Sequence, residues 1–315
     1  MRRRGVWTAV VAIAAAAVIL PTAAQADTTF YAGPMFGIDK APGGQLLVAD
    51  AGRGVVDADT GALVASLPGV TDVAPIGRGD MLVLTSTFAP GAHGALYRVS
   101  KGSTRKLADL QQYELQNDPA GDGTAEGSDP YDLARLAGGK TLIADAAGND
   151  LLVADETGNI DWVATFPEQS GAQAVPTSVD IGPDGAYYVG ELTGFPATPG
   201  LSRVWRVAPG MRHAHCGTSP ACSVVVNGLT SIIDLVFGPD GKLYVAQLDD
   251  ASWRAVEEGG GVGGSVHACD VATGSCQTVV SHVPILTSIA FRGSTLWGAI
   301  WALVPGQADV IPLAP

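Results

Sequence analysis

The stretches 177–191 (TSVDIGPDGAYYVGE) and 233–247 (IDLVFGPDGKLYVAQ) carry one phrase, in which an apolar segment leads through Pro-Asp-Gly into a second segment that ends in a polar residue. Proline presets φ and glycine accepts a positive φ, so this tripeptide favours a tight turn. The flanking segments are about five residues long and rich in β-branched and aromatic side chains. Each stretch therefore predicts a β-hairpin.

This hairpin phrase is repeated along the chain. It recurs at 36–50 (FGIDKAPGGQLLVAD), 71–85 (TDVAPIGRGDMLVLT) and 131–145 (YDLARLAGGKTLIAD), with a shortened copy at 287–299 (TSIAFRGSTLWGA). A weaker pair of strands follows, as at 95–100 and 104–110. Each unit therefore predicts four antiparallel strands. A sheet of this size cannot bury both faces alone, and radial packing of several sheets buries them.

The spacing of the repeats indicates the number of blades. Six units across residues 27–315 give about 48 residues per unit, close to the size of a propeller blade. The last unit lacks a fourth strand, whereas residues 28–33 (TTFYAG) precede the first hairpin as outer strands precede later ones. We therefore predict an all-β, six-bladed β-propeller of four-stranded antiparallel blades, closed by an N-terminal strand (28–31) in the last blade. Five or seven blades stay open as alternatives, because two units carry long insertions.

The composition agrees with a folded β protein and excludes one class of partner. The 315 residues contain 18 Lys and Arg against 31 Asp and Glu, a net charge of −13. This balance argues against nucleic-acid binding, which requires clustered positive charge. A hydrophobic fraction of 47% argues against disorder, and 41 glycines favour a turn-rich β protein over a helical bundle.

The first 26 residues have the pattern of a secretory signal peptide. Arg2, Arg3 and Arg4 precede the weakly polar-to-apolar run 5–20, and Ala24-Gln25-Ala26 forms a small-x-small cleavage site. The run is shorter than the about 20 residues of a spanning helix, although an uncleaved anchor is the alternative. We expect cleavage after Ala26, one propeller domain over 27–315, no membrane span after cleavage, and a secreted monomer.

The four cysteines form two local pairs, Cys216 with Cys222 and Cys269 with Cys276. Each pair brackets a turn-like segment, and exported proteins meet an oxidising environment, so we expect two hairpin-closing disulfides. A zinc site from His213, His215, Cys216 and Cys222 is the alternative. It is disfavoured because five residues separate the two cysteines, whereas zinc sites commonly separate them by two to four.

Two stretches resemble a known family. Residues 182–210 (GPDGAYYVGELTGFPATPGLSRVWRVAPG) and 112–152 are similar to the secreted ScyD/ScyE family, named after a scytonemin biosynthesis cluster. Its usual E-x-x-N-P-D-G and S-N-P-Y patterns correspond here to the segments 114–119 (ELQNDP) and 128–131 (SDPY), so Asp129 departs from the family's Asn. Residues 144–155 more loosely resemble an NHL repeat. The resemblance implies an exported six-bladed propeller of the NHL-like and SMP-30-like kind, and it implies little about activity.

Two rings of residues are expected to converge near the propeller axis. The strand-start positions of the hairpins are Gly37, Asp72, Asp132, Ser178, Asp234 and Ser288. The strand-end positions are Asp50, Thr85, Asp145, Glu191, Gln247 and Ala299. This alignment of the six hairpins assumes one strand register, and a shift of the alignment by one residue would turn each side chain to the other face of its sheet.

The carboxylates in these rings suggest a cation site. Clustered carboxylates raise one another's pKa and favour a bound cation, and hard oxygen ligands suit Ca²⁺ or Mg²⁺. The expected metal ligands are Asp72, Asp132, Asp145, Glu191 and Asp234. The alternative is structural: each carboxylate caps loop N–H groups or pairs with a neighbouring blade.

Three insertions, 111–130, 192–201 and 248–265, are expected to form the rim of the funnel, because loops carry function more often than the scaffold does. Plain surface insertions are the alternative. The first is acidic, and the second could present Phe195 to a ligand. Together with the two rings, the insertions predict ligand-binding side chains at Asp50, Asp72, Glu114, Asn117, Asp118, Tyr131, Asp132, Asp145, Glu191, Phe195 and Asp234.

Two functions fit these features. The first is a non-catalytic secreted protein that binds a small molecule or a partner at the acidic funnel. The second is a metal-dependent hydrolase of the gluconolactonase type, in which a divalent ion activates water or polarises a carbonyl. The chain contains neither a G-x-S-x-G nor an H-E-x-x-H motif, and the two rings offer no asparagine, so the sequence favours the binding protein.

Overall fold

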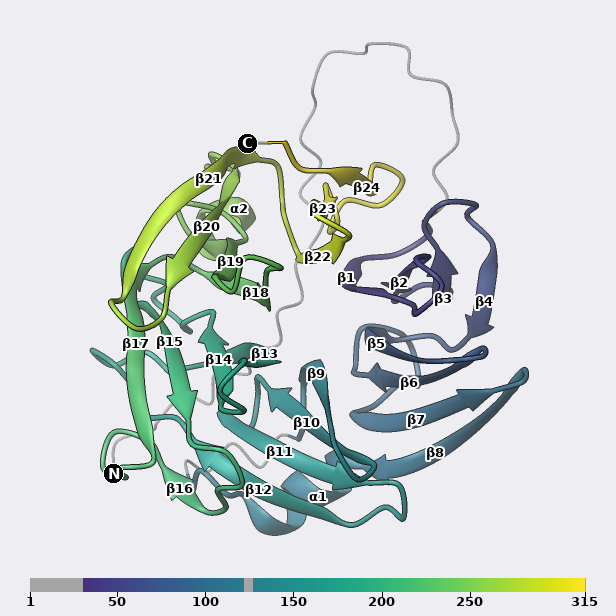
Figure 1. Ribbon diagram of the computed structural model, residues 1–315, viewed down its shortest axis with the longest axis horizontal. Coiled ribbons are helices and arrows are strands. Elements are labelled where there is room, and N and C mark those ends of the chain that lie inside the picture. Colours follow the sequence, from purple (N-terminus) through teal and green to yellow (C-terminus); the bar gives the residue numbers. More distant parts are fainter. Residues whose placement is uncertain (1–30, 122–126, 315) are drawn as a thin grey trace.

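The computed structural model describes residues 31–121 and 127–314. Within these residues six mainly antiparallel sheets stand in a ring, with the first strand of each sheet at the centre (Figure 1). This arrangement confirms the six-bladed β-propeller. The predicted closing strand at 28–31 lies outside the described residues except for Tyr31.

The first three blades follow the chain order from the axis outward. Blade 1 contains β1 (Met35–Lys40), β2 (Leu46–Asp50), β3 (Gly54–Asp57) and β4 (Leu63–Ser66). Blade 2 contains β5 (Val70–Gly77), β6 (Asp80–Thr85), β7 (Ala95–Ser100) and β8 (Ser103–Asp109). Blade 3 contains β9 (Pro130–Leu136), β10 (Lys140–Asp145), β11 (Asp150–Asp155) and β12 (Ile160–Thr165).

The last three blades repeat this plan with two variations: the fourth strand of blade 4 is β17 (Cys222–Leu229), because β16 (Ala214–His215) joins another blade, and blade 6 has three strands in the described residues. Blade 4 contains β13 (Pro176–Ile181), β14 (Tyr187–Glu191), β15 (Ser202–Val207) and β17 (Cys222–Leu229). Blade 5 contains β18 (Ile232–Phe237), β19 (Leu243–Gln247), β20 (Gly264–Asp270) and β21 (Ser275–Val283). In the described residues blade 6 has three strands, β22 (Ser288–Arg292), β23 (Thr295–Ile300) and β24 (Asp309–Pro312).

One strand crosses between blades and was not predicted. β16 (Ala214–His215) belongs by chain order to the loop between β15 and β17 of blade 4, but it pairs in parallel with β12 at the outer edge of blade 3. The Cys216 N–H donates to the Thr165 carbonyl at 2.9 Å, and the Cys216–Cys222 disulfide closes the loop. This loop, residues 208–221, is called the strap below.

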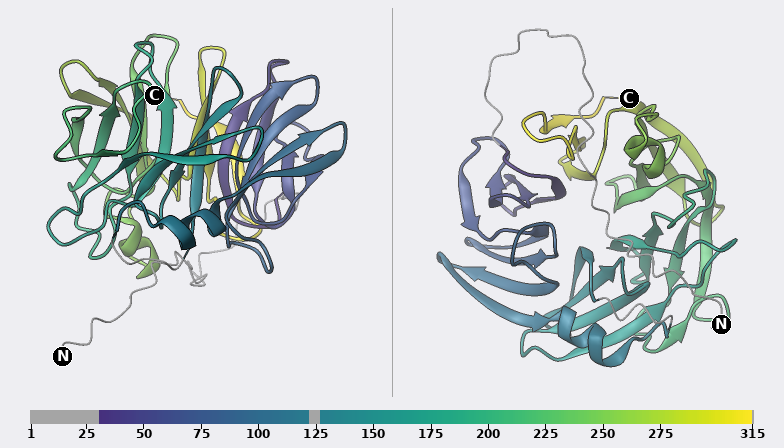
Figure 2. Two further views of the ribbon diagram at one scale, coloured as in Figure 1. Left: turned by 90° about the horizontal axis from the view of Figure 1, so that it is seen from below. Right: turned by 180° about the vertical axis from the view of Figure 1, so that it is seen from behind.

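Two short helices lie in the insertions. α1 (Leu110–Asn117) follows β8 and begins at Asp109, whose side chain accepts from the Gln112 N–H. α2 (Trp253–Glu257) lies between β19 and β20 and begins at Ser252. Both helices lie on the same side of the ring, opposite the turns of the inner hairpins (Figure 2, left).

The first strand carries a β-bulge near its start in blades 1 to 5. The extra residues are Phe36, Thr71, Tyr131, Thr177 and Ile233. A bulge re-aims the side chain that it inserts. Here the re-aimed side chains alternate between bulky ones in blades 1, 3 and 5 and threonine in blades 2 and 4.

The bulky side chains close the axis at this end. Phe36 packs on Phe88 with ring centroids 4.3 Å apart and edge-on against Tyr131 at 5.4 Å. Leu192 and Ile233 belong to the same buried apolar cluster. We call Phe36, Phe88, Tyr131, Leu192 and Ile233 the axial plug.

The threonines link neighbouring blades. The hydroxyl of Thr71 donates to the Pro130 carbonyl of the next blade, and Thr177 likewise donates to Ile232, both at 2.8 Å. Thr287, just before β22, continues the pattern by donating to Met35 of blade 1 at 2.8 Å. Blade 6 and blade 1 are thereby joined within the described chain.

Candidate functional site

A cavity of about 510 Å³ lies on the axis and is lined by the first strands of all six blades. Its exposed lining residues Lys40 and Arg135 stand near the ends of β1 and β9, next to the hairpin turns. The cavity therefore opens on the hairpin side. Phe36, Tyr131 and Ile233 of the axial plug line its other end.

The predicted strand-start carboxylates meet in this cavity. Asp72, Asp132 and Asp234 line its wall, and each accepts a backbone N–H from the first strand of the next blade. The donors are Leu133 at 3.1 Å, Val179 at 2.6 Å and Ile289 at 2.7 Å. The first strand of a blade has a free edge toward the axis, and buried N–H groups on such an edge require acceptors. At these three positions the carboxylates therefore pair with a neighbouring blade, which is the structural alternative to a cation site given above.

The remaining strand-start residues differ from one another. Ser288 accepts from the Ile38 N–H at 3.0 Å and donates to Asp234 at 2.7 Å, so it extends the same chain of contacts into blade 1. Gly37 lines the cavity, and a side chain there would collide with the Asp72 carboxyl. Ser178 is fully buried opposite Gly190 and is not part of the cavity wall.

Two further carboxylates line the cavity and were missed by the sequence analysis. Asp39 and Asp180 stand two residues after Gly37 and Ser178, in the two opposite blades whose strand-start residue is small. Alternate residues of a strand share a face, so the same repeat alignment could have located them. The Asp180 carboxylate accepts from the Phe237 N–H of blade 5 at 2.8 Å.

Burial and mutual repulsion raise the pKa of these acids. Burial raises the pKa of Asp72 to about 7, and that of Asp39 to about 6, to which nearby Asp180 contributes. The pKa values of Asp132 and Asp234 lie well above the ordinary range, first through burial and then through repulsion by another carboxylate of the cavity. Burial also raises the pKa of Asp180. The cavity therefore keeps protons that exposed aspartates would lose.

The carboxyl groups of Asp72 and Asp132 lie next to one another. Both accept from the Leu133 N–H, at 3.1 and 2.7 Å. Beyond burial, repulsion by Asp72 raises the pKa of Asp132 further. A cation placed beside the two groups would relieve this repulsion.

The strand-end residues do not join this cavity. Asp50 accepts three loop N–H groups, from Ala32, Gly33 and Gly52. Asp145 accepts from the Ser128 hydroxyl and from the N–H groups of Asp129 and Gly148. Burial raises the pKa of Asp145. The expected convergence of the two rings is corrected accordingly: the bulge separates the two positions, and the axial plug lies between the cavity and the other face.

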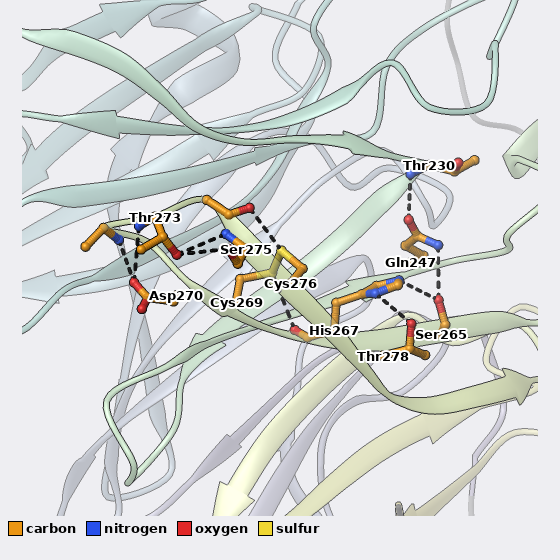
Figure 3. The surroundings of a disulfide bond; sticks show 12 residues. Thr230, Gln247, Ser265, His267, Cys269, Asp270, Thr273, Ser275, Cys276 and Thr278 are labelled. Carbon is orange, nitrogen blue, oxygen red and sulfur yellow. Dashed lines mark hydrogen bonds between the residues drawn. A yellow bond between two sulfur atoms is a disulfide. The ribbon is translucent and has the colours of Figure 1, made fainter.

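Glu191 and Gln247, at the ends of β14 and β19, tie neighbouring strands and loops to one another. Arg203 forms an ion pair with Glu191 at 2.7 Å, and Trp205 donates its indole N–H to the same carboxylate at 2.5 Å. Gln247 accepts from the Thr230 N–H at 2.6 Å and donates to Ser265 at 3.1 Å (Figure 3). These contacts are structural ties between strands.

The described parts of the insertions do not line the cavity, and their helices α1 and α2 lie on the face opposite its mouth, so they do not form its rim. Glu114 of α1 is buried beside Gly148, close to Asp145. Asn117 and Asp118 cap the end of α1, and Asp118 adopts a left-handed conformation with φ 39°. Phe195 is 59% exposed and packs under the Arg254 guanidinium at 4.9 Å.

Both cysteine pairs form disulfides, as predicted. Cys216 is bonded to Cys222, and Cys269 is bonded to Cys276 across β20 and β21 (Figure 3). His213 and His215 face blade 3, where His213 pairs with Asp161 at 2.7 Å and His215 contacts Thr165.

The carboxylates are spread around the cavity. In residues 31–121 and 127–314, no three His, Cys, Asp or Glu side chains gather closely enough to hold one metal ion. The oxygens of Asp132 and Asp234 already accept from backbone N–H groups. These residues do not form a compact coordination shell, and Ca²⁺ or Mg²⁺ binding stays a prediction.

Comparisons with known proteins place the chain by fold. No family model and no curated protein matches the sequence. Virginiamycin B lyase from Staphylococcus aureus, solved as an inactive variant with quinupristin, has 14% identity and a TM-score of 0.55, over 92% of this chain and 87% of the lyase. A PQQ-bound aldose sugar dehydrogenase from Streptomyces coelicolor has 11% identity and a TM-score of 0.58, over 91% and 96% of the two chains.

A putative glucose dehydrogenase from Thermus thermophilus gives 13% identity and a TM-score of 0.61, over 91% of this chain and 98% of its own. At 11–14% identity these likenesses show that the fold is shared. One fold hosts lyases and dehydrogenases, so the likeness shows the architecture and leaves the activity to the residues of the site.

Proposed function

We propose that this protein binds a small organic cation in its axial cavity and performs no chemistry on it. The observation that supports the proposal is the set of five aspartates, Asp39, Asp72, Asp132, Asp180 and Asp234, around one open cavity of about 510 Å³. Among the described residues of the lining, the cationic side chains are Lys40 and Arg135. A negative cavity with partly apolar walls favours a positively charged molecule.

An organic cation suits the cavity better than a bare metal ion does. The aspartates are divided between two levels of the wall, and apolar side chains such as Ala74, Ala134 and Val236 occupy the outer level beside Asp39 and Asp180. A volume of about 510 Å³ is within the usual range for a small-molecule site. An ammonium group also needs fewer convergent oxygens than Ca²⁺ does.

The proposal is tested by calorimetric titration at about pH 8 with butylammonium, Ca²⁺ and Mg²⁺ in separate experiments. We expect heat from the amine in wild type and loss of that heat in Asp132→Asn or Asp234→Asn. Glu258→Gln removes an exposed carboxylate at the C-cap of α2, outside the cavity lining, and is the matched control. Absence of heat from every ammonium compound would overturn the proposal.

The titrations with Ca²⁺ and Mg²⁺ test the second function, a metal-dependent hydrolase. Heat from Ca²⁺ or Mg²⁺, together with turnover of lactones in the presence of that ion, would favour a hydrolase of the gluconolactonase type. Circular dichroism of each variant shows whether a lost signal reflects the site or the fold.

The protein is also proposed to act after export. Its two disulfides are compatible with an extracellular protein. No helix in the described part of the chain is long and apolar enough to cross a membrane. Amino-terminal sequencing of the protein recovered from the culture medium tests the proposal, because we expect a start at Asp27.

A further inference from the structure

We infer that the ligand of the axial cavity is a diammonium compound, with one ammonium group among the strand-start aspartates and the other between Asp39 and Asp180. The inference rests on the proposed function and names its ligand class. The basis is the division of the cavity wall into two acidic levels that face one another along the axis.

The two levels follow from the strand register. Asp72, Asp132 and Asp234 occupy the strand-start position in blades 2, 3 and 5, whereas Asp39 and Asp180 stand two residues further in blades 1 and 4. Each residue advances a strand by about 3.3 Å, so the levels are about 7 Å apart. An extended diamine with a chain of about four or five carbons places its two nitrogens at about this separation.

The inner level is built to hold one positive charge. The carboxyl groups of Asp72 and Asp132 accept from the same Leu133 N–H, and Asp234 lines the same cavity. An ammonium group can donate up to three hydrogen bonds to such carboxylates. The axial plug beneath this level prevents deeper entry, so a chain attached to the ammonium group must run toward the mouth.

The outer level offers a second, separate charge site. Asp39 and Asp180 lie in opposite blades and both line the cavity, and Asp180 contributes to the raised pKa of Asp39. The other blades present Ala74, Ala134, Val236 and Ala290 at the same position. Small apolar side chains leave room for a methylene chain, and the cationic side chains of Lys40 and Arg135 stand next to the hairpin turns at the mouth.

Calorimetric titration at about pH 8 compares ligands that carry one ammonium group with ligands that carry two. We expect 1,4-diaminobutane and 1,5-diaminopentane to bind at least about tenfold more tightly than butylamine. The short 1,2-diaminoethane cannot span both levels, so it should bind like the monoamine. Equal affinity for butylamine and 1,4-diaminobutane would overturn the inference and leave the proposed function standing. No heat from any amine would overturn both.

Substitution of the outer level provides the second measurement. Asp39→Asn/Asp180→Asn should weaken 1,4-diaminobutane by about tenfold and change butylamine by less than about twofold. Asp72→Asn should weaken both ligands, because it removes an inner charge. Glu258→Gln should change neither. Equal losses for both ligands in the Asp39/Asp180 variant contradict the assignment of the second ammonium group, and thermal melting confirms that each variant is folded.

Discussion

At the residue scale, the raised pKa values of the cavity aspartates make stability depend on pH. The pKa of Asp72 is about 7 and that of Asp39 about 6, whereas unfolded aspartate titrates near 4. The folded chain holds these protons longer than the unfolded chain, so stability falls as pH rises between the two values. The stabilisation is fully present below about pH 4 and is lost through about pH 6 to 7.

We therefore expect the melting temperature to fall between about pH 5 and pH 8, and Asp72→Asn to reduce the fall. Asparagine imitates the protonated acid and can still accept from the Leu133 N–H. Asp155 is the opposite case, because hydrogen bonds from Thr157 and Asn159 lower its pKa. Asp155→Asn should not raise the melting temperature at pH 8. Scanning calorimetry across pH measures both variants, and an unchanged profile for Asp72→Asn contradicts the account.

Gly37 provides a steric prediction at the same scale. A β-carbon at Gly37 would lie 2.9 Å from the Asp72 Cα and against its carboxyl group, whereas one at Gly43 would meet nothing within 4 Å. Gly37→Ala should lower the free energy of unfolding by about 1–3 kcal/mol, a typical cost of overpacking. Gly43→Ala should change it by less than about 0.5 kcal/mol. Urea denaturation measures the free energy of unfolding of both variants. Similar values for the two would show that the structure around Asp72 relaxes enough to accommodate the added β-carbon.

At the element scale, the strap depends on a covalent closure. The Cys216–Cys222 bond holds β16 where it pairs with β12, while the Cys216 and His213 N–H groups donate to Thr165 and Trp162. Cys216→Ser/Cys222→Ser should speed hydrogen exchange in 208–221 and cost about 2 kcal/mol of stability. Cys269→Ser/Cys276→Ser, in blade 5, should leave exchange in 208–221 unchanged. Unaltered protection after the first double substitution would mean that strand pairing alone holds the strap.

The inner hairpins could be predicted because their signal is local. Pro-Asp-Gly with flanking apolar strands specifies a hairpin without help from the rest of the chain, and the repeat then specifies the ring. β16 could not be predicted, because two residues pair with a strand about 50 positions earlier and nothing in their own sequence indicates it.

The bulges explain what was missed in the site. One inserted residue at the start of β1 or β9 separates the strand-start position from the strand-end position of the same hairpin. Asp72 and Asp234 line the axial cavity as expected, whereas the strand-end residues Asp50 and Asp145 do not. Asp39 and Asp180 were missed because the repeat was compared at one position and not two residues further.

At the scale of the whole molecule, the threonine contacts between blades act at three joints around the ring. Thr71, Thr177 and Thr287 are buried, and each donates to a carbonyl of the next blade. Valine has nearly the same shape and removes the donor, so each Thr→Val substitution leaves a carbonyl unpaired. We expect a loss of about 1–2 kcal/mol for each, and nearly additive losses because the sites are far apart.

The joint at Thr287 should be the most sensitive of the three. The other two threonines join blades that are consecutive in the chain. Blades 6 and 1 come instead from opposite ends of the described sequence. They meet only through non-covalent contacts, such as those of Ser288 with Ile38 and of Met35 with Ala302. Thr287→Val should therefore lower the urea midpoint most, and Thr218→Val, at an exposed hydroxyl, should leave it unchanged. Equal midpoints for Thr71→Val and Thr287→Val would mean that closure of the ring is secured elsewhere.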